Sequence, residues 1–299
     1  MRMRDVGSWK PLWSAPVAFI ARASNGKMWI GILLILALIS LALLVDLILQ
    51  LDPYKQSLAL RLKPPGFHGP RGEFFLLGTD QFGRDVLARL VHGMRVPLLV
   101  AALSALFGTA IGLWLGLLSG YFGGLADWIV SLFIDIQISL PFILVALFVL
   151  SLFGSSVTII VAMFSLLSWP AVARVARVEA RHLRGSLFIE ACRASGLSQT
   201  RIVLRHVLPN ALAPVIVIAV AQVAQFIIAE ASLGFFGLGI APPEPTWGNM
   251  LSDGRNYMVQ AWWLNVAPGV CVILLAGAAN LFGEGLREFL DPRQDGVEL

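Results

Sequence analysis

Long apolar runs alternate with short charged segments along the whole chain. A helix that crosses a bilayer needs roughly 20 mostly apolar residues. The stretch from 136 to 173 is too long for one such helix, and the sequence FGSS at 153–156 is typical of a turn between two. The pattern therefore predicts six membrane-spanning helices, over 28–49, 96–120, 128–151, 155–173, 211–233 and 262–283.

The composition agrees with a chain that crosses a membrane several times. Of its 299 residues, 58% are hydrophobic and 13% are charged, whereas soluble domains carry roughly 25% charged residues. We therefore expect an all-α integral membrane protein. The first apolar run has no charge from 28 to 45, which is too long for the core of a signal peptide, so we expect it to remain as the first span.

The basic residues predict the orientation, because lysine and arginine are retained on the cytoplasmic side. Residues 1–27 carry five basic residues and one acid, so this segment is expected in the cytoplasm. Six crossings then place the loop 174–210 and the tail 287–299 there as well. The loop 50–95 would lie outside and conflicts with the rule, since it also contains basic residues: Lys55, Arg61, Lys63, Arg71, Arg84, Arg89 and Arg95. Long loops follow the rule least.

Two outer segments have their own patterns. Residues 77–95 have apolar positions at helical spacing after Thr79, a possible N-cap, which predicts an amphipathic helix on the outer membrane surface. The segment with Pro242, Pro243 and Trp247 favours a stiff, extended connector with an interfacial tryptophan anchor.

The second predicted span has a small residue at every fourth position. Such a stripe lets the backbone of another helix approach closely, although single glycines are common in membrane helices. We therefore expect an intimate helix contact, and the partner is open: a helix of this chain or one of a second subunit. The stripe consists of Ser104, Gly108, Gly112, Gly116 and Gly120.

The charged loop 174–210 interrupts the apolar sequence. Its residues favour a helix over about 175–194, a turn at Gly196, and a second helix that begins after Ser198 and is stopped by Pro209. Three interpretations fit: a solvated loop that only sets topology, a DNA-reading helix-turn-helix, or a docking element for a soluble partner. Confinement between two spans disfavours DNA.

Asp135 and Glu230 fall inside predicted spans, where ionisable residues are usually functional. Asp135 is either an interfacial acid or part of a transport pathway, and Glu230 has either a buried partner or a pathway position. Pro141 is expected to kink the third span, and Pro170 to end or bend the fourth.

The loop resembles the EAA loop of permease subunits in ATP-binding-cassette importers. Glu190, Ala191, Gly196 and the Leu208–Pro209 pair match that pattern, and Cys192 stands where a second alanine is usual. Further blocks resemble the second permease of dipeptide and oligopeptide importers, a family that includes nickel and glutathione importers: LGTDQFGRDVLARL, GYFGG, RHVLPN, LGFFGLGIAPPEPTWGNMLSDGRNY and NLFGEGLREFLDPR.

This resemblance implies a type I importer fold with a permease core over 96–286. The expected partners are a homologous second permease, two ATPase subunits that bind ATP and magnesium, a periplasmic or lipid-anchored binding protein, and lipids, with no nucleic acid. Peptides are the implied substrate, with nickel, glutathione or an opine-like solute as alternatives. Residues expected to contact the ATPases are Glu190, Ala191, Cys192, Arg193, Gly196, Arg201 and Arg205. Residues expected to face the binding protein are Gly78, Thr79, Asp80, Gly83, Arg84, Asp85, Pro242, Pro243, Trp247 and Gly248.

Several kinds of chemistry have no sequence support. The chain contains no phosphate-binding Gly-Lys-Ser/Thr loop, and Cys192 and Cys271 fit neither a disulfide framework nor a metal site. We therefore expect no cofactor in this chain and no ATP hydrolysis by it. A stand-alone secondary transporter remains a rival, and would predict coupled intramembrane charges and an inverted repeat. An intramembrane enzyme is disfavoured because no catalytic pair falls within the spans.

Overall fold

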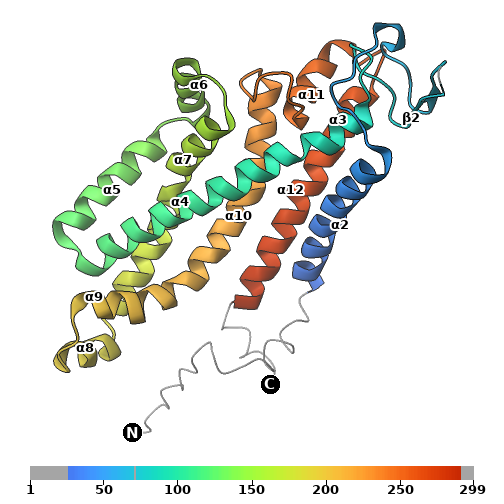
Figure 1. Cartoon of the computed structure of the whole chain (residues 1–299). Helices are drawn as coiled ribbons and strands as arrows, with labels where there is room; N and C mark the ends of the chain where they lie inside the picture. The colour runs from blue at the N-terminus through green and yellow to red at the C-terminus, as the bar shows by residue number, and fades with distance from the viewer. Residues whose placement is uncertain (1–25, 71, 291–299) are drawn as a thin grey trace.

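The computed structural model, which describes residues 26–70 and 72–290, is a bundle of long helices (Figure 1). Among these residues, five helices are long and apolar enough to cross a membrane. The bent pair α5 (Gly124–Ser139) and α6 (Phe142–Phe153) raises the number to six if it is one crossing. The predicted all-α membrane fold is confirmed. The outer parts of the two predicted terminal segments, 1–25 and 291–299, lie outside the described residues. The long elements are α2 (Gly26–Leu49), α4 (Arg95–Phe122), α5 (Gly124–Ser139), α6 (Phe142–Phe153), α7 (Val157–Arg184), α10 (Leu208–Phe235) and α12 (Trp263–Leu290).

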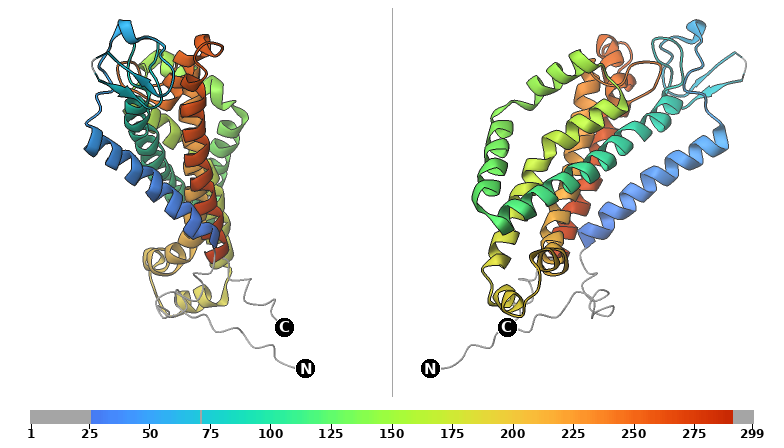
Figure 2. Two further views of the ribbon diagram at one scale, coloured as in Figure 1. Left: turned by 90° about the vertical axis from the view of Figure 1, so that its right-hand side faces the viewer. Right: turned by 60° about the vertical axis from the view of Figure 1, so that its left-hand side comes forward.

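Short elements occupy the two ends of the bundle (Figures 1 and 2). We call these ends the α8 end and the α11 end. The α8 end carries α8 (Leu187–Ala194), α9 (Gln199–Ile202) and the π-helical turn η3 (Val203–Val207). The α11 end carries η2 (Leu58–Leu60), the antiparallel strands β1 (Phe67–His68) and β2 (Phe74–Phe75), α3 (Val86–Gly93), α11 (Trp247–Gly254) and η4 (Arg255–Tyr257).

The small-residue stripe of α4 packs against α7 of the same chain, which answers the question left open by the sequence. A Cβ atom added at Gly112 would lie 2.5 Å from the carbonyl oxygen of Trp169. Gly108, Gly116 and Gly120 meet successive turns of α7 in the same way, and Ser104 is fully buried. Only very small residues allow this approach, so the stripe holds the backbones of α4 and α7 in close contact.

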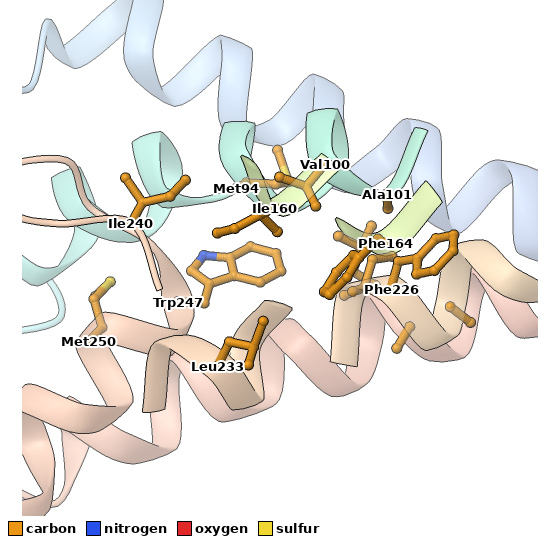
Figure 3. Close-up of a cluster of buried hydrophobic side chains, with 14 of the residues drawn as sticks. Met94, Val100, Ala101, Ile160, Phe164, Phe226, Leu233, Ile240, Trp247 and Met250 are labelled. Atoms are coloured by element: carbon orange, nitrogen blue, oxygen red, sulfur yellow. The ribbon is translucent and has the colours of Figure 1, made fainter. Parts of the chain in front are cut away.

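An apolar cluster fills the space between the long helices near the α11 end (Figure 3). The rings of Phe164 and Phe226 stack with centroids 5.3 Å apart, and Trp247 of the same cluster has 2% of its surface exposed. The first helix, α2, is more peripheral and packs on α12, where Gly31 lies against the backbone of Phe282.

The proline predictions have mixed outcomes. The third span breaks at Leu140 and Pro141, with 90° between α5 and α6, which confirms the predicted kink. The prediction that Pro170 could end the fourth span is wrong, because α7 continues through it to Arg184. Packing along α4 on both sides of Pro170 holds that helix together.

The loop 174–210 differs from its predicted two helices. The single helix expected over 175–194 is wrong: α7 ends at Arg184, and α8 begins after Ser186, whose hydroxyl caps it. The expectation that Pro209 stops the second helix is also wrong, since Pro209 lies in the first turn of α10. Proline is tolerated there because it needs no N–H acceptor, and the π-helical turn leads the chain directly into the span.

Candidate functional sites at the two ends of the bundle

The short helix α8 presents an apolar and acidic face to its surroundings. Leu187 and Phe188 are 83% and 57% exposed, and Glu190 and Ala191 are exposed beside them. Ile189 is buried and holds the opposite face against the bundle. Exposed apolar side chains beside polar ones are typical of a protein contact surface.

The turn after α8 has the predicted geometry. Gly196 has a φ of +79°, the left-handed conformation that favours glycine. Its N–H donates to the carbonyl oxygen of Arg193 at 3.0 Å, and the hydroxyl of Ser198 caps α9. The turn glycine and the serine cap are therefore confirmed.

Side chains on the inner face join this turn to the end of α4. The Tyr121 hydroxyl donates to Oε1 of Gln199 at 2.5 Å, and the guanidinium of Arg193 lies 5.4 Å from the centre of the Tyr121 ring. Cys192 is also half-buried against the bundle. Of the arginines expected to contact an ATPase, the exposed ones are Arg201 and Arg205.

An ion pair fixes α5 to α7 near the same end. Both carboxylate oxygens of Asp127 accept hydrogen bonds from Arg177, and Arg181 donates a further one at 2.7 Å. The bidentate geometry favours a rigid contact.

A buried charged cluster lies at the α11 end. Oδ2 of Asp80 accepts hydrogen bonds from Nε of Arg84 at 2.6 Å and from Nη1 of Arg89 at 2.7 Å, and these three side chains are 5% to 8% exposed. Asp253 of α11 lies 3.6 and 3.7 Å from the same arginines. Burial raises the pKa of Asp253. The cluster therefore ties the outer loop to α11.

These contacts overturn the expectation that the motif at 78–85 faces a partner. Thr79, Asp80 and Arg84 are buried, and the carbonyl of Thr79 accepts a hydrogen bond from Trp263. Gly78 and Gly83 adopt φ values of +76° and +71° and press against the backbone of 57–65. The motif therefore packs in the interior of the outer loop and stabilises its fold.

The predicted amphipathic surface helix is also corrected. The N-cap of α3 is Asp85, not Thr79, and α3 runs on into α4 with only Met94 between them. Arg89 of its predicted polar face is not solvated, because it is buried against Asp80. Burial raises the pKa of Asp85, which caps the helix through the N–H of Leu87.

The connector before the last span is partly helical. Trp247 begins α11 and donates to the carbonyl of Leu90 at 2.9 Å, so it is a core residue rather than an interfacial anchor. Gly248 is buried against α10 and cannot face a partner directly. Pro242 and Pro243 are exposed.

Several basic residues of the outer loop have partners within the chain. Arg84 and Arg89 belong to the buried cluster, Lys55 pairs with Glu73 at 3.2 Å, and Arg61 donates to the hydroxyl of Tyr257 at 3.1 Å. Arg71 lies outside the described residues.

Asp135 and Glu230 lie in different environments in the structure. Glu230 is fully buried in α10, and neither carboxylate oxygen has a hydrogen-bond partner among the described residues. The partner that the sequence offered as one alternative is therefore not present in this part of the chain. Asp135 is exposed on α5.

Residues 112–296 match the family described as "Binding-protein-dependent transport system inner membrane component". The chain belongs to this family. It is thus a type I importer permease, and the matched region begins within α4, after the peripheral α2 and the outer loop. Among the described residues, no cluster of histidine, cysteine, aspartate or glutamate is arranged to hold a metal ion.

Curated relatives cover nearly the whole permease. The di/tripeptide transport system permease protein DppC of Pseudomonas aeruginosa is 36% identical over 88% of this chain and 87% of its own. The dipeptide transport system permease protein DppC of Haemophilus influenzae is 34% identical over 92% and 93%. The protein of the same name from Alkalihalophilus pseudofirmus is 34% identical over 92% and 89%.

Sequence reasoning missed the residues that join distant elements. Tyr121 and Gln199, like Asp127 and Arg177, are far apart in the sequence, and neither pair has a local pattern. Asp253 was missed because one acid in a polar loop gives no signal of its own.

Proposed function

We propose that this permease forms half of the membrane pathway of an ATP-driven peptide importer. Its partners would be a homologous second permease, two ATPase subunits that bind ATP and magnesium, and a binding protein outside the cell. The peptide substrate is supported by the names of three relatives that match along almost their full length.

The observation that carries the coupling role is the exposed face of α8. A short helix with Leu187, Phe188 and Glu190 on its outer face, fixed between two spans, is a rigid lever for a soluble partner. A loop that only set topology would have no reason to expose large apolar residues to water.

The orientation follows from this role. ATP is hydrolysed in the cytoplasm, so the α8 end would lie there, together with both termini, in the inner membrane of a prokaryote. The α11 end would then lie outside, where the exposed Pro242 and Pro243 and the outer hairpin offer a surface to a periplasmic or lipid-anchored binding protein.

The alternatives differ in substrate or in energy source. Nickel, glutathione or an opine-like solute would use the same architecture, because the binding protein supplies much of the selectivity. A stand-alone secondary transporter would need ion-coupling charges in the spans, and among the described residues neither Asp135 nor Glu230 forms an ion pair with a basic residue.

Transport in proteoliposomes separates these alternatives. The permease pair is reconstituted with its ATPases and loaded binding protein, and uptake of a labelled dipeptide is measured with ATP inside, with ATP omitted, or with an ion gradient alone. We expect uptake only with ATP and binding protein together. Uptake by the permease alone under an ion gradient would refute the proposal.

A further inference from the structure

A narrow apolar groove lies between the first helix and the start of the second span. The helix α2 is at the edge of the bundle (Figures 1 and 2) and packs mainly on α12, so its second half leaves a space beside α3 and α4. This space has a volume of about 110 Å³. Its apolar lining consists of Ile39, Ala42, Leu43, Val91, Met94 and Leu98.

The groove opens toward the surroundings of the bundle. Leu43 of its lining is 61% exposed, and Leu36 and Leu47 on the same face of α2 are 56% and 77% exposed. Exposed leucines of a spanning helix border lipid or another membrane helix. A whole helix, about 10–12 Å in diameter, cannot enter so small a space, whereas an acyl chain can.

Charged groups lie where the groove meets the outer loop. Arg95 completes the lining and is exposed. Burial and a hydrogen bond to Glu244 raise the pKa of Tyr54, and the positive charge of Arg95 opposes them, which places Arg95 near this tyrosine. The Tyr54 hydroxyl donates to Oε2 of Glu244 at 3.0 Å, and Glu244 is exposed. A cation and a carboxylate therefore adjoin the same tyrosine at the Arg95 end of the groove.

These groups complement the parts of one class of membrane lipid. An acyl chain fits the apolar lining, and a guanidinium forms strong hydrogen bonds with a phosphate. A carboxylate accepts hydrogen bonds from a primary ammonium group. A headgroup that carries both a phosphate and a primary amine pairs with Arg95 and Glu244 at once, whereas an anionic headgroup without an amine leaves Glu244 facing like charge.

We propose that the groove binds one phospholipid of the phosphatidylethanolamine class. One acyl chain lies between α2 and the start of α4, the phosphate pairs with Arg95, and the ammonium group pairs with Glu244. The lipid fills the space beside the peripheral first span and links that span to the outer loop and to the connector before α11. This role is additional to peptide transport and does not depend on the substrate.

The test uses the complete transporter in lipid nanodiscs and three photoactivatable lipids with identical, diazirine-bearing acyl chains: phosphatidylethanolamine, phosphatidylglycerol and diacylglycerol. Labelled residues are located by mass spectrometry of peptides. Ala42→Phe fills the groove, and Ala37→Phe makes the same change at an exposed position of α2 outside it. Arg95→Gln and Glu244→Gln remove the two charges. Subunit composition and the thermal midpoint are recorded for every variant.

In the wild type we expect phosphatidylethanolamine to label residues 39–43 and 91–98 most strongly, phosphatidylglycerol less and diacylglycerol least. Ala42→Phe should lower this labelling by roughly fivefold or more, because its ring occupies the groove, and Ala37→Phe should leave it unchanged. Arg95→Gln should abolish the preference for the two phospholipids over diacylglycerol. Glu244→Gln should abolish the preference for phosphatidylethanolamine over phosphatidylglycerol.

Three results would overturn the lipid site. Equal labelling by the three lipids in the wild type would show that the groove has no headgroup preference. Undiminished labelling in an intact Ala42→Phe complex would place the lipid elsewhere. A photoreactive amino acid at Leu43 that captures the second permease instead of lipid would make the groove a contact between subunits.

Discussion

The hydroxyl of Tyr121 donates a hydrogen bond of 2.5 Å to the side chain of Gln199, and so joins the end of α4 to the start of α9. Arg193 of α8 lies over the same aromatic ring. Because α4 packs along α7 through its glycine stripe, we expect a displacement of α8 to be transmitted to both spanning helices.

Tyr121→Phe should weaken coupling while the helices remain folded. The variant loses one hydrogen bond, worth about 0.5–1.5 kcal/mol, but keeps the ring beneath Arg193. We expect fewer peptides transported per ATP hydrolysed, measured by parallel uptake and phosphate-release assays. Tyr121→Ala should lower this ratio further, because both contacts are lost. An unchanged ratio in both variants would show that the link is not used.

Gly196→Val should disrupt the turn after α8 through backbone strain alone. A Cβ at this position meets nothing within 4 Å, and φ is +79°, so the expected cost is about 1–2 kcal/mol. Transport should fall, and Gly196→Asn should retain more of it because asparagine tolerates this conformation. Gly185→Ala is the matched control, since Gly185 has an ordinary φ of −87° and should transport normally. Equal effects at both sites would contradict the account.

Gly112→Val should destabilise the contact between α4 and α7. The added side chain would press against the carbonyl of Trp169 and the side chain of Val172, and overpacking of this kind costs typically about 1–3 kcal/mol. Thermal denaturation of the purified complex should show a lower midpoint. Gly277→Val in α12 is the control, because a Cβ there meets nothing within 4 Å. A similar shift in both variants would argue against a special role for the stripe.

Asp80→Asn should loosen the outer loop from α11. Removing one partner of a buried ion pair costs about 3–5 kcal/mol, since Arg84 and Arg89 would remain buried beside only the more distant Asp253. We expect faster proteolysis of the outer loop at neutral pH. The exposed pair of Lys55 and Glu73 provides the control: Lys55→Met should change little, because surface pairs contribute about 0–1 kcal/mol. Equal protease resistance of Asp80→Asn and the wild type would count against the buried cluster.

The sequence predicted those features that depend on residues close to one another along the chain. Hydropathy located the spans, because each is a continuous apolar run, and Gly196 and Ser198 followed from local turn and capping preferences. The outer motif was misread for the same reason: Asp85 and Arg89 have the spacing of a solvated helix face, and only the fold shows that Asp80 neutralises Arg89 in the interior.

Contacts between residues far apart in the chain could not be predicted from the sequence. The stripe from Gly108 to Gly120 predicted a close helix contact but not that α7 would supply it, since small residues on α7 are mixed with larger ones. Trp247 looked like an interfacial anchor because prolines precede it. Its burial depends on the approach of α3, whose Leu90 carbonyl accepts its N–H.

Photo-crosslinking from α8 tests the central claim most directly. A photoreactive amino acid is placed at Leu187, which is 83% exposed at the α8 end, and separately at Val259, which is 98% exposed beyond η4 at the other end. In the assembled, transport-active complex, position 187 should crosslink to an ATPase subunit and position 259 should not. Crosslinking to the ATPase from position 259, or none from position 187, would contradict the assignment of α8 as the coupling helix.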